Sequence, residues 1–331
     1  MPDALDVPGA GGPDDRLDVL ATSLATSLVV AVVGATATGK SSLALDLAET
    51  LGGEIVNADA SQLYRGMDIG TAKVPFDQRR GIAHHQLDVL DIHEDASVAA
   101  YQRQARADIG AITRRCRTPV VVGGSGLYVK AALDVLDIPP TDPQVRAAWE
   151  KELVDNGVEV LYGVLTRKDP VAAAGIDPRN ARRIVRALEV MEITKRPFSA
   201  SMPDREYVTA AVQLAIRVPR HDLDVRIGRR SAQMWVDGFL AEVESLEAHG
   251  LSRTKTASRA LGYAQGLTQL AGRLSEAEAI EDTARATRRL SRRQDSWFGA
   301  DPRIVWLDEG PGLTARALAA VERARQPHVV P

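Results

Sequence analysis

A glycine-rich loop between a strand pattern and a helix pattern constrains the fold of this chain most. Residues 29–41 read VVAVVGATATGKS, and Gly34-x-x-x-x-Gly39-Lys40-Ser41 matches the P-loop spacing at every position. The glycines let the backbone approach phosphate oxygens closely, and amides of the loop and of the following helix N-terminus converge on the anion. The pattern therefore predicts a site for a phosphate or diphosphate, without identifying the compound that carries it.

We expect the whole loop to take part in binding. Its amides would hold phosphate oxygens, Lys40 would add a positive charge, and the Ser41 hydroxyl would be a ligand of Mg²⁺, the cofactor that we expect. The predicted diphosphate-binding residues are Gly34, Ala35, Thr36, Ala37, Thr38, Gly39, Lys40 and Ser41.

The composition is that of an ordinary globular protein. The chain has 331 residues, 45% of them apolar, and a net charge of −3, which leaves room for a local basic stripe. The single cysteine, Cys116, excludes an intramolecular disulfide framework and a multi-cysteine zinc site. The uncharged stretch 19–33 follows an aspartate-rich segment and is shorter than a spanning helix. We therefore expect a cytoplasmic protein that does not bind a membrane.

Strand and helix patterns alternate before residue 130. This alternation predicts a doubly wound α/β core around a parallel sheet. The predicted strands are 29–33, 54–59, 85–92 and 118–126, and the predicted helices between them are 41–51 and 97–116.

Three helix patterns then follow one another without a strand, at 143–157, 158–169 and 181–195. A strand pattern returns at 211–218, and the remainder is helical apart from a short strand at 303–307. We therefore expect a P-loop parallel-sheet core with a helical insertion domain. The predicted parts are a disordered leader at 1–25, a core made of 26–136 and 208–331, and the insertion at 137–207.

Asp59 is the carboxylate that we expect to face the bound phosphate. It ends one predicted strand, while the P-loop and the glycines at 123–126 each follow another. Ligands of parallel sheets bind beyond the carboxyl ends of the strands, so all three segments should meet there. The carboxylate could hold Mg²⁺ or accept a proton from a nucleophile, or it could simply cap the next helix. The spacing alone leaves these alternatives open.

Arginines cluster in three segments. Those after the 211–218 strand could bind a leaving phosphate or form a solvated helix face. Two dense stripes, at 179–186 and 285–293, favour an anionic polymer as partner and together predict a clamp around RNA, although either stripe alone could be a solvated surface. The clustered residues are Arg226, Arg229 and Arg230; Arg179, Arg182, Arg183 and Arg186; and Arg285, Arg288, Arg289, Arg292 and Arg293.

The chain resembles the bacterial tRNA dimethylallyltransferase (tRNA isopentenyltransferase) family. The segment NADASQLYRGMDIGTAK at 57–73 follows the P-loop at the family's distance, and RRIVRALEV at 182–190 and RRQDSWF at 292–298 come later in the family's order. The resemblance covers nearly everything but the two ends. It implies transfer of a dimethylallyl group from dimethylallyl diphosphate to the exocyclic N6 amine of the adenosine 3′-adjacent to the tRNA anticodon. Diphosphate is released and Mg²⁺ assists.

The resemblance also implies roles for individual residues. Asp59 matches the general base, Arg226 matches the arginine on the diphosphate, and the Thr38 hydroxyl is a third catalytic candidate. Contacts with tRNA are implied near the reactive base and on a helix of the insertion, and the stripe at 285–293 adds two more. The predicted tRNA-binding residues are Asp59, Ala60, Ser61, Gln62, Ser125, Arg146, Ala181, Arg182, Arg183, Ile184, Val185, Arg289 and Arg292.

Two other functions explain parts of the pattern. A P-loop small-molecule kinase would use the P-loop and Asp59 but leave both arginine stripes and the insertion without a role. A nucleotide-regulated RNA-binding protein would use the stripes but make Asp59 incidental. We expect the tRNA anticodon stem-loop and dimethylallyl diphosphate as partners, and a monomer.

Overall fold

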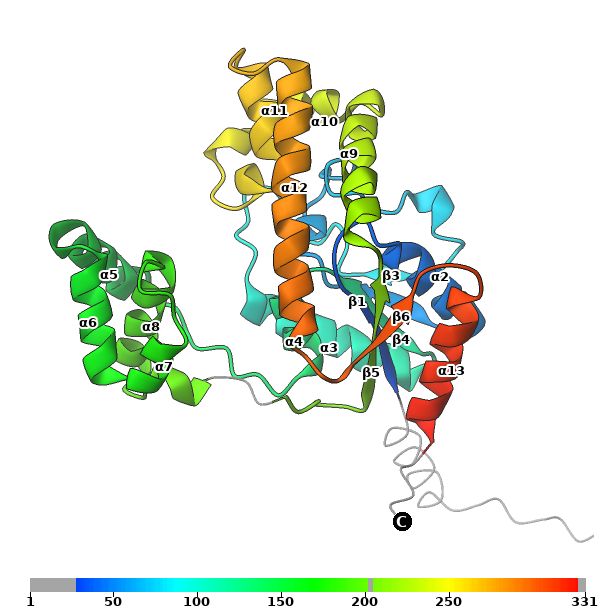
Figure 1. Cartoon of the computed structure of the whole chain (residues 1–331), viewed down its shortest axis with the longest axis horizontal. Coiled ribbons are helices and arrows are strands. Elements are labelled where there is room, and N and C mark those ends of the chain that lie inside the picture. The colour runs from blue at the N-terminus through cyan, green and yellow to red at the C-terminus, as the bar shows by residue number, and fades with distance from the viewer. Residues whose placement is uncertain (1–27, 202–204, 327–331) are drawn as a thin grey trace, which may run out of the picture. The chain divides into compact units, whose positions relative to one another are not determined.

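The computed structural model describes residues 28–201 and 205–326, so the predicted leader at 1–25 lies outside the described residues. The chain divides into two compact units (Figure 1). The first is formed by Met1–Leu133 and Thr209–Pro331, and the second by Asp134–Val208. In sequence the second unit is an insertion into the first, a few residues wider than the predicted range 137–207.

The first unit is built on a six-stranded sheet with the order β3-β2-β4-β1-β5-β6, in which every neighbouring pair is parallel. The predicted α/β class is thus confirmed. The long strand predicted at 85–92 is wrong beyond His85, because Gln86 and Asp88 have left-handed backbone with φ of 59° and 56°. The strands are β1 (Val29–Val33), β2 (Glu54–Asn57), β3 (His84–His85), β4 (Pro119–Gly123), β5 (Ala211–Arg217) and β6 (Ile304–Asp308).

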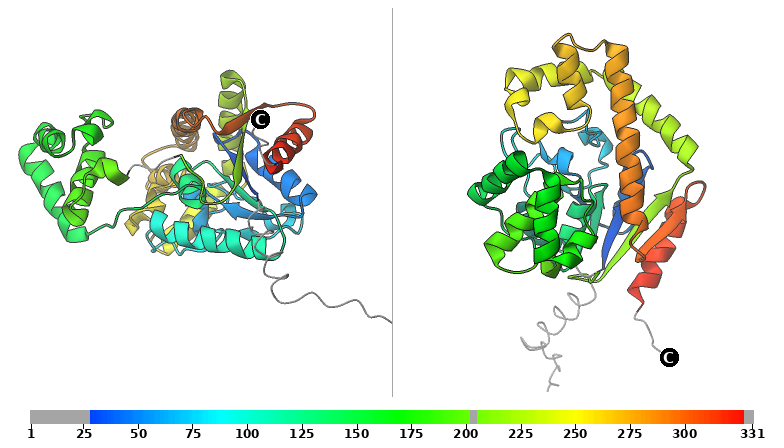
Figure 2. Two further views of the ribbon diagram at one scale, coloured as in Figure 1. Left: turned by 90° about the horizontal axis from the view of Figure 1, so that it is seen from below. Right: turned by 60° about the vertical axis from the view of Figure 1, so that its left-hand side comes forward.

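Helices cover the sheet and extend beyond its carboxyl edge (Figures 1 and 2). Val30 and Val32 of β1 pack in one core with Leu43 and Leu47 of α2 and with Val321 of α13. All five residues of β1 are buried, which explains why this strand reads as a continuous apolar run. The α-helices described in this unit are α2 (Lys40–Thr50), α3 (Val98–Arg114), α4 (Gly126–Leu133), α9 (Arg220–Val236), α10 (Phe239–Ala248), α11 (Tyr263–Leu270), α12 (Glu276–Gly299) and α13 (Leu313–Arg325).

Helices α9 to α12 form a cluster with an apolar core of its own. Phe239 lies edge-on to both Trp235 and Tyr263, with ring centroids 4.8 and 5.1 Å apart. Tyr64 and Met67, from the loop after β2, are buried in the same core. The loop that follows Asp59 is therefore packed between the sheet and this cluster.

The second unit is helical. Its core includes Leu161, Leu165, Ile184 and Leu188. The three predicted helices are confirmed, and the short α7, which begins at a proline, was not predicted. Within residues 28–201 and 205–326, no helix is long and apolar enough to cross a membrane. The helices of this unit are α5 (Pro143–Asn156), α6 (Val158–Lys168), α7 (Pro170–Ala174) and α8 (Ala181–Thr194).

Candidate active site

The P-loop joins β1 to α2 through three residues with positive φ. These are Gly34 (122°), Ala37 (66°) and Gly39 (90°), the last of which is the N-cap of α2. Left-handed positions turn successive amides toward one side of the loop, a backbone arrangement that suits an anion. The Thr38 hydroxyl and the Lys40 ammonium both donate hydrogen bonds to the carbonyl oxygen of Ala35 and brace the loop from within.

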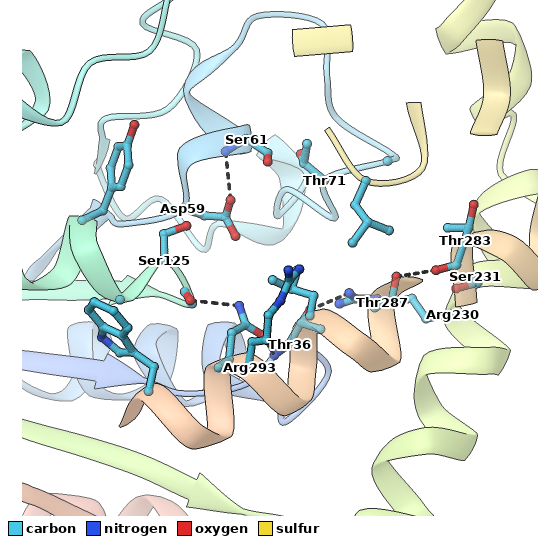
Figure 3. A pocket seen from close by; sticks show the side chains of 18 of the residues that line it. Thr36, Asp59, Ser61, Thr71, Ser125, Arg230, Ser231, Thr283, Thr287 and Arg293 are labelled. Atoms are coloured by element: carbon cyan, nitrogen blue, oxygen red, sulfur yellow. Dashed lines mark hydrogen bonds between the residues drawn. The ribbon is translucent and has the colours of Figure 1, made fainter. Parts of the chain in front are cut away.

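A cavity of about 490 Å³ opens beside the P-loop (Figure 3). Thr36 of the P-loop, Asp59 after β2 and Arg230 of α9 all line it, so three segments that are distant in sequence contribute polar groups to one space. Apolar side chains line the same cavity and would suit a short hydrocarbon group. They are Leu127, Met234, Leu261 and Leu290.

Asp59 both caps a helix and faces this cavity. Its Oδ1 accepts a hydrogen bond from the Ser61 N–H at 3.0 Å, at the start of the 3₁₀ helix Ala60–Leu63. Burial raises the pKa of the carboxyl above its usual range, opposed by the Ser61 amide and by the charges of Lys40 and Arg230. A carboxylate has several acceptor positions, so capping leaves it able to accept a proton. Asp59 can therefore cap the 3₁₀ helix and also act as a proton acceptor.

Two cations share the neighbourhood of Asp59. Burial, together with the positive charge of Arg230, lowers the pKa of the Lys40 ammonium to about 8, although the charge of Asp59 opposes the shift. Arg230 donates from Nη2 to the Thr36 hydroxyl at 2.6 Å. Burial also lowers the pKa of Arg230, but a guanidinium stays protonated at neutral pH. Like charges held together away from water attract an anion strongly.

Two residues expected to be catalytic, Arg226 and Thr38, do not line the cavity. Arg226 donates from Nη2 to Glu309 Oε2 at 2.7 Å and is not among the residues that line the cavity. The Thr38 side chain is only 5% exposed and turns toward Ala35. Arg230, one helical turn after Arg226, and Thr36, two residues before Thr38, reach the cavity instead.

Gln294 of α12 joins two loops of the site and was not singled out from the sequence. Its Oε1 accepts from the Thr36 N–H at 2.9 Å, and its Nε2 donates to the Gly124 carbonyl at 2.9 Å. A Cβ on Gly124 would lie 2.4 Å from that Nε2, so the close approach requires glycine. The only signal for Gln294 in the sequence is its position on the buried stripe of α12, which also contains Thr287, Ser291 and Phe298.

The loop after β2 is held by polar contacts that shape the cavity wall. The Glu242 carboxylate accepts hydrogen bonds from the N–H groups of residues 68–70 and from the Tyr263 hydroxyl. Gln62, a predicted tRNA contact, donates from Nε2 to the Thr71 carbonyl at 3.0 Å. Ser125, another predicted contact, accepts from the Ala60 N–H at 3.2 Å and still lines the cavity beside Asp59.

The arginines of α12 divide into two groups. One group forms ion pairs with nearby carboxylates. By contrast, Arg289 and Arg293 are exposed and lie four residues apart, and neither side chain has an ion pair or hydrogen bond with any described residue. Arg292, predicted to bind tRNA, belongs to the first group. The pairs are Arg285 with Asp282, Arg288 with Glu281 and Arg292 with Asp224.

The predicted tRNA contacts of the insertion differ in their exposure. Ile184 and Val185 are 0% and 5% exposed in the core of the second unit, so their side chains cannot reach RNA. Arg146 pairs at 2.7 Å with the buried carboxylate of Glu189, which Arg186 also contacts. Arg182 and Arg183 are exposed, and Ala181 beside them is half-buried.

The residues present fit a magnesium ion held mainly by a phosphate ligand. Among the described residues, no group of three or more histidine, cysteine or carboxylate side chains could hold a metal. Ser41 is exposed at the start of α2, directly after Lys40. Mg²⁺ keeps several waters and often takes one or two protein ligands together with substrate phosphates, so a single hydroxyl at this position suffices.

Proteins of one enzyme family match this chain over most of its length. The model of the IPP transferase family matches residues 62–301. The chain is 54% identical over 300 residues to the tRNA dimethylallyltransferase of Streptomyces griseus, covering 89% of this chain and 96% of that protein. It is also 54% identical over 301 residues to the tRNA dimethylallyltransferase of Salinispora arenicola, covering 91% and 88%.

The fold is also similar to solved structures of tRNA-modifying transferases. A tRNA isopentenylpyrophosphate transferase from Bacillus halodurans has a TM-score of 0.65 and 34% identity, covering 90% of this chain and 98% of that one. A eukaryotic dimethylallyltransferase that acts on tRNA shares the fold with a TM-score of 0.77, at 24% identity, covering 91% of this chain and 80% of that one. The chain thus belongs to the tRNA dimethylallyltransferase family that its sequence motifs resemble.

Proposed function

We propose that this protein transfers the dimethylallyl group of dimethylallyl diphosphate to the N6 amine of the adenosine 3′-adjacent to the tRNA anticodon, with release of diphosphate. The observation that carries the proposal is one cavity in which a carboxylate, Asp59, faces the P-loop and Arg230 beside apolar walls. A diphosphate needs the cations, a prenyl chain needs the apolar walls, and an amine that attacks carbon needs a proton acceptor.

The P-loop amides, Lys40 and Arg230 would hold the diphosphate. Negative charge grows on it as the carbon–oxygen bond breaks, and cations fixed in a poorly solvated site stabilise that charge. The position of Arg230 makes it, rather than Arg226, our candidate for the arginine on the diphosphate, and Thr36 replaces Thr38 as the candidate hydroxyl. When bound, Mg²⁺ would neutralise part of the diphosphate charge, with Ser41 as its protein ligand.

Asp59 would act on the tRNA adenine that receives the dimethylallyl group. The adenine must leave the anticodon-loop stack to enter the cavity, and unstacking is inexpensive in a loop. The N6 lone pair forms the new nitrogen–carbon bond while the carbon–oxygen bond electrons leave with the diphosphate, and the N6 proton passes to the Asp59 carboxylate. A raised pKa makes this carboxylate a better proton acceptor, while Lys40 and Arg230 favour its ionised form.

Binding of tRNA would use the unpaired cations. Arg289 and Arg293 on α12, and Arg182 and Arg183 on α8, are exposed and free to contact phosphates. The protein would act as a monomer. A tRNA substrate is consistent with a cytoplasmic location.

Two measurements test the proposal. Mass spectrometry of tRNA digests should show that cells lacking the protein lose N6-dimethylallyladenosine, and that the wild-type gene, but not an Asp59→Asn variant, restores it. In vitro, labelled dimethylallyl diphosphate should label tRNA, whereas labelled ATP should label neither tRNA nor a small molecule. Phosphoryl transfer from ATP would favour the kinase alternative, and unchanged tRNA modification would overturn the proposal.

A further inference from the structure

Trp297 of α12 is an exposed aromatic side chain on the wall of the reaction cavity. It lines the cavity together with Ser125 and Gly126, yet 45% of its surface is exposed. Only 4% of the chain is aromatic, and large rings such as Tyr101, Phe239 and Tyr263 are fully buried. An exposed indole at the site of the chemistry therefore differs from the aromatic residues that form the cores.

The α4 helix fixes the position of this indole. A Cβ on Gly126 would lie 2.0 Å from the indole Nε1 and 2.2 Å from Cδ1, so the ring rests directly on the backbone and only glycine fits beneath it. Lys130, one turn further along α4, places its Nζ 5.4 Å from the ring centroid. The ring is thus oriented before any substrate arrives, which lowers the entropy lost when a second flat group stacks on it.

A purely structural role does not account for these contacts. Gln294 already joins α12 to the loop before α4, and Phe298, next to Trp297, is buried with 2% exposure. A structural tryptophan usually buries its ring and donates its N–H, as Trp235 does to Gln269 at 2.8 Å. The Trp297 Nε1 has no acceptor among the residues that the structure describes.

The charges around the indole point to the class of ligand. Arg289, Arg293 and Trp297 follow one another at intervals of four residues, so they lie along one face of α12. Both arginines lack a described partner, and Lys130 adds a third cation beside the ring. An aromatic face flanked by unpaired cations matches a nucleobase and the phosphates next to it.

We propose that the open face of Trp297 stacks on a purine of the tRNA anticodon loop and holds it at the cavity. The purine is the adenosine to be modified or its 3′ neighbour. Trp297 is then a substrate-positioning residue, which the sequence analysis did not identify. The inference rests on the proposed transfer to tRNA. Base–aromatic stacking of the usual strength predicts that Trp297→Ala weakens binding of an anticodon stem-loop by roughly ten- to a hundredfold.

Stem-loops that contain 2-aminopurine test this directly. The fluorescent base replaces either the target adenosine or its 3′ neighbour, and because it lacks the 6-amino group it reports binding at the target without reaction. Wild-type enzyme should quench one of the two probes strongly, and the position that responds identifies the stacked base. Trp297→Ala should abolish this quenching, and Trp297→Phe should restore most of it.

Trp306→Phe is the matched control, because this half-buried tryptophan lies on β6 and does not line the cavity. It should leave quenching unchanged. Trp297→Ala should raise KM for the unmodified stem-loop and leave the Kd of dimethylallyl diphosphate unchanged, with the thermal midpoint showing that the variant is folded. If wild-type enzyme prenylates the stem-loop but quenches neither probe in a Trp297-dependent way, the inference is overturned and the proposed function stands. A wild-type enzyme that prenylates no stem-loop would instead refute the proposed function.

Discussion

The guanidinium of Arg230 donates a hydrogen bond to the Thr36 hydroxyl at 2.6 Å and so connects α9 to the P-loop. The contact follows from the sheet, because α9 follows β5, the P-loop follows β1, and these strands are parallel neighbours. Parallel neighbours bring their carboxyl ends together, so α9 and the P-loop start from the same edge of the sheet, and an arginine on α9 can reach a ligand held by the loop. Asp59 is close enough for its charge to affect both Arg230 and Lys40.

Replacing Arg230 should damage the enzyme more than replacing Arg226. We expect Arg230→Ala to lower kcat by roughly a hundredfold or more, as for removal of one group that stabilises developing charge. Arg226→Ala is the matched control, since it removes the same charge one turn away and loses only a partly exposed pair with Glu309. Steady-state kinetics with dimethylallyl diphosphate and tRNA compare the two. A larger loss in Arg226→Ala would return the diphosphate role to Arg226.

Substituting Asp59 by asparagine separates its two roles. Asparagine caps a helix about as well as aspartate but cannot accept the N6 proton. We expect the variant to fold, to bind both substrates and to turn over at least roughly a hundredfold more slowly. Single-turnover rates and the thermal midpoint are the measurements. Near-normal turnover would mean that Asp59 only caps the 3₁₀ helix that begins at Ala60.

Removing the P-loop side chains should weaken binding of dimethylallyl diphosphate and leave binding of tRNA unchanged. Lys40→Ala and Ser41→Ala are expected to weaken binding of dimethylallyl diphosphate, and Ser41→Ala should also raise the Mg²⁺ concentration needed for half-maximal rate. Affinity for tRNA in the absence of the donor serves as the control and should change little. A folded Lys40→Ala protein with strongly reduced tRNA binding would contradict this division of roles.

The activity should fall at both ends of the pH range for opposite reasons. The pKa of Lys40 is lowered to about 8, so its ammonium is charged below that pH and loses its proton above it. The pKa of Asp59 is raised, so the carboxylate is ionised above that pKa and loses its charge as the pH falls through it. A plot of kcat/KM for dimethylallyl diphosphate against pH should therefore decline above about 8. In Lys40→Arg the alkaline decline should move to higher pH, and an unmoved decline would assign it to another group.

The parts of the fold that local patterns determine could be predicted from the sequence. Residues 29–50 contain a strand buried on both faces, a glycine loop and the start of a helix. Each of these elements has a recognisable local sequence pattern. The same holds for Asp59, because a residue that ends a parallel strand must lie at the ligand-binding edge.

Choices between neighbouring residues could not be predicted, because tertiary contacts make them. Arg226 and Arg230 share one face of a helix, and only the placement of Glu309 and Thr36 separates an ion pair from a cavity residue. Within 181–185 the arginines face solvent while Ile184 and Val185 enter a core, and the motif that contains them does not distinguish binding from packing. Gln294 matters through two backbone partners that are far away in sequence.

Finally, we expect α12 to bind tRNA mainly through its unpaired arginines, Arg289 and Arg293. Arg289→Ala with Arg293→Ala removes two exposed cations that have no described partner. Each arginine bound to a phosphate releases counterions, so the slope of log affinity against log salt should become shallower by roughly 0.7 to 0.9 for each such arginine that is removed.

Arg285→Ala with Arg288→Ala is the matched control, because it removes the same charge from the same helix but from residues already paired with Asp282 and Glu281. Its salt slope should change much less. Arg292→Ala, which removes a cation already paired with Asp224, should also have a smaller effect than Arg293→Ala. The measurement is salt-titrated binding of an anticodon stem-loop to these variants and to the wild type, which gives the salt slope of each. Equal slopes for both double variants would show that α12 attracts tRNA only through its total charge, and the specific role of Arg289 and Arg293 would have to be abandoned.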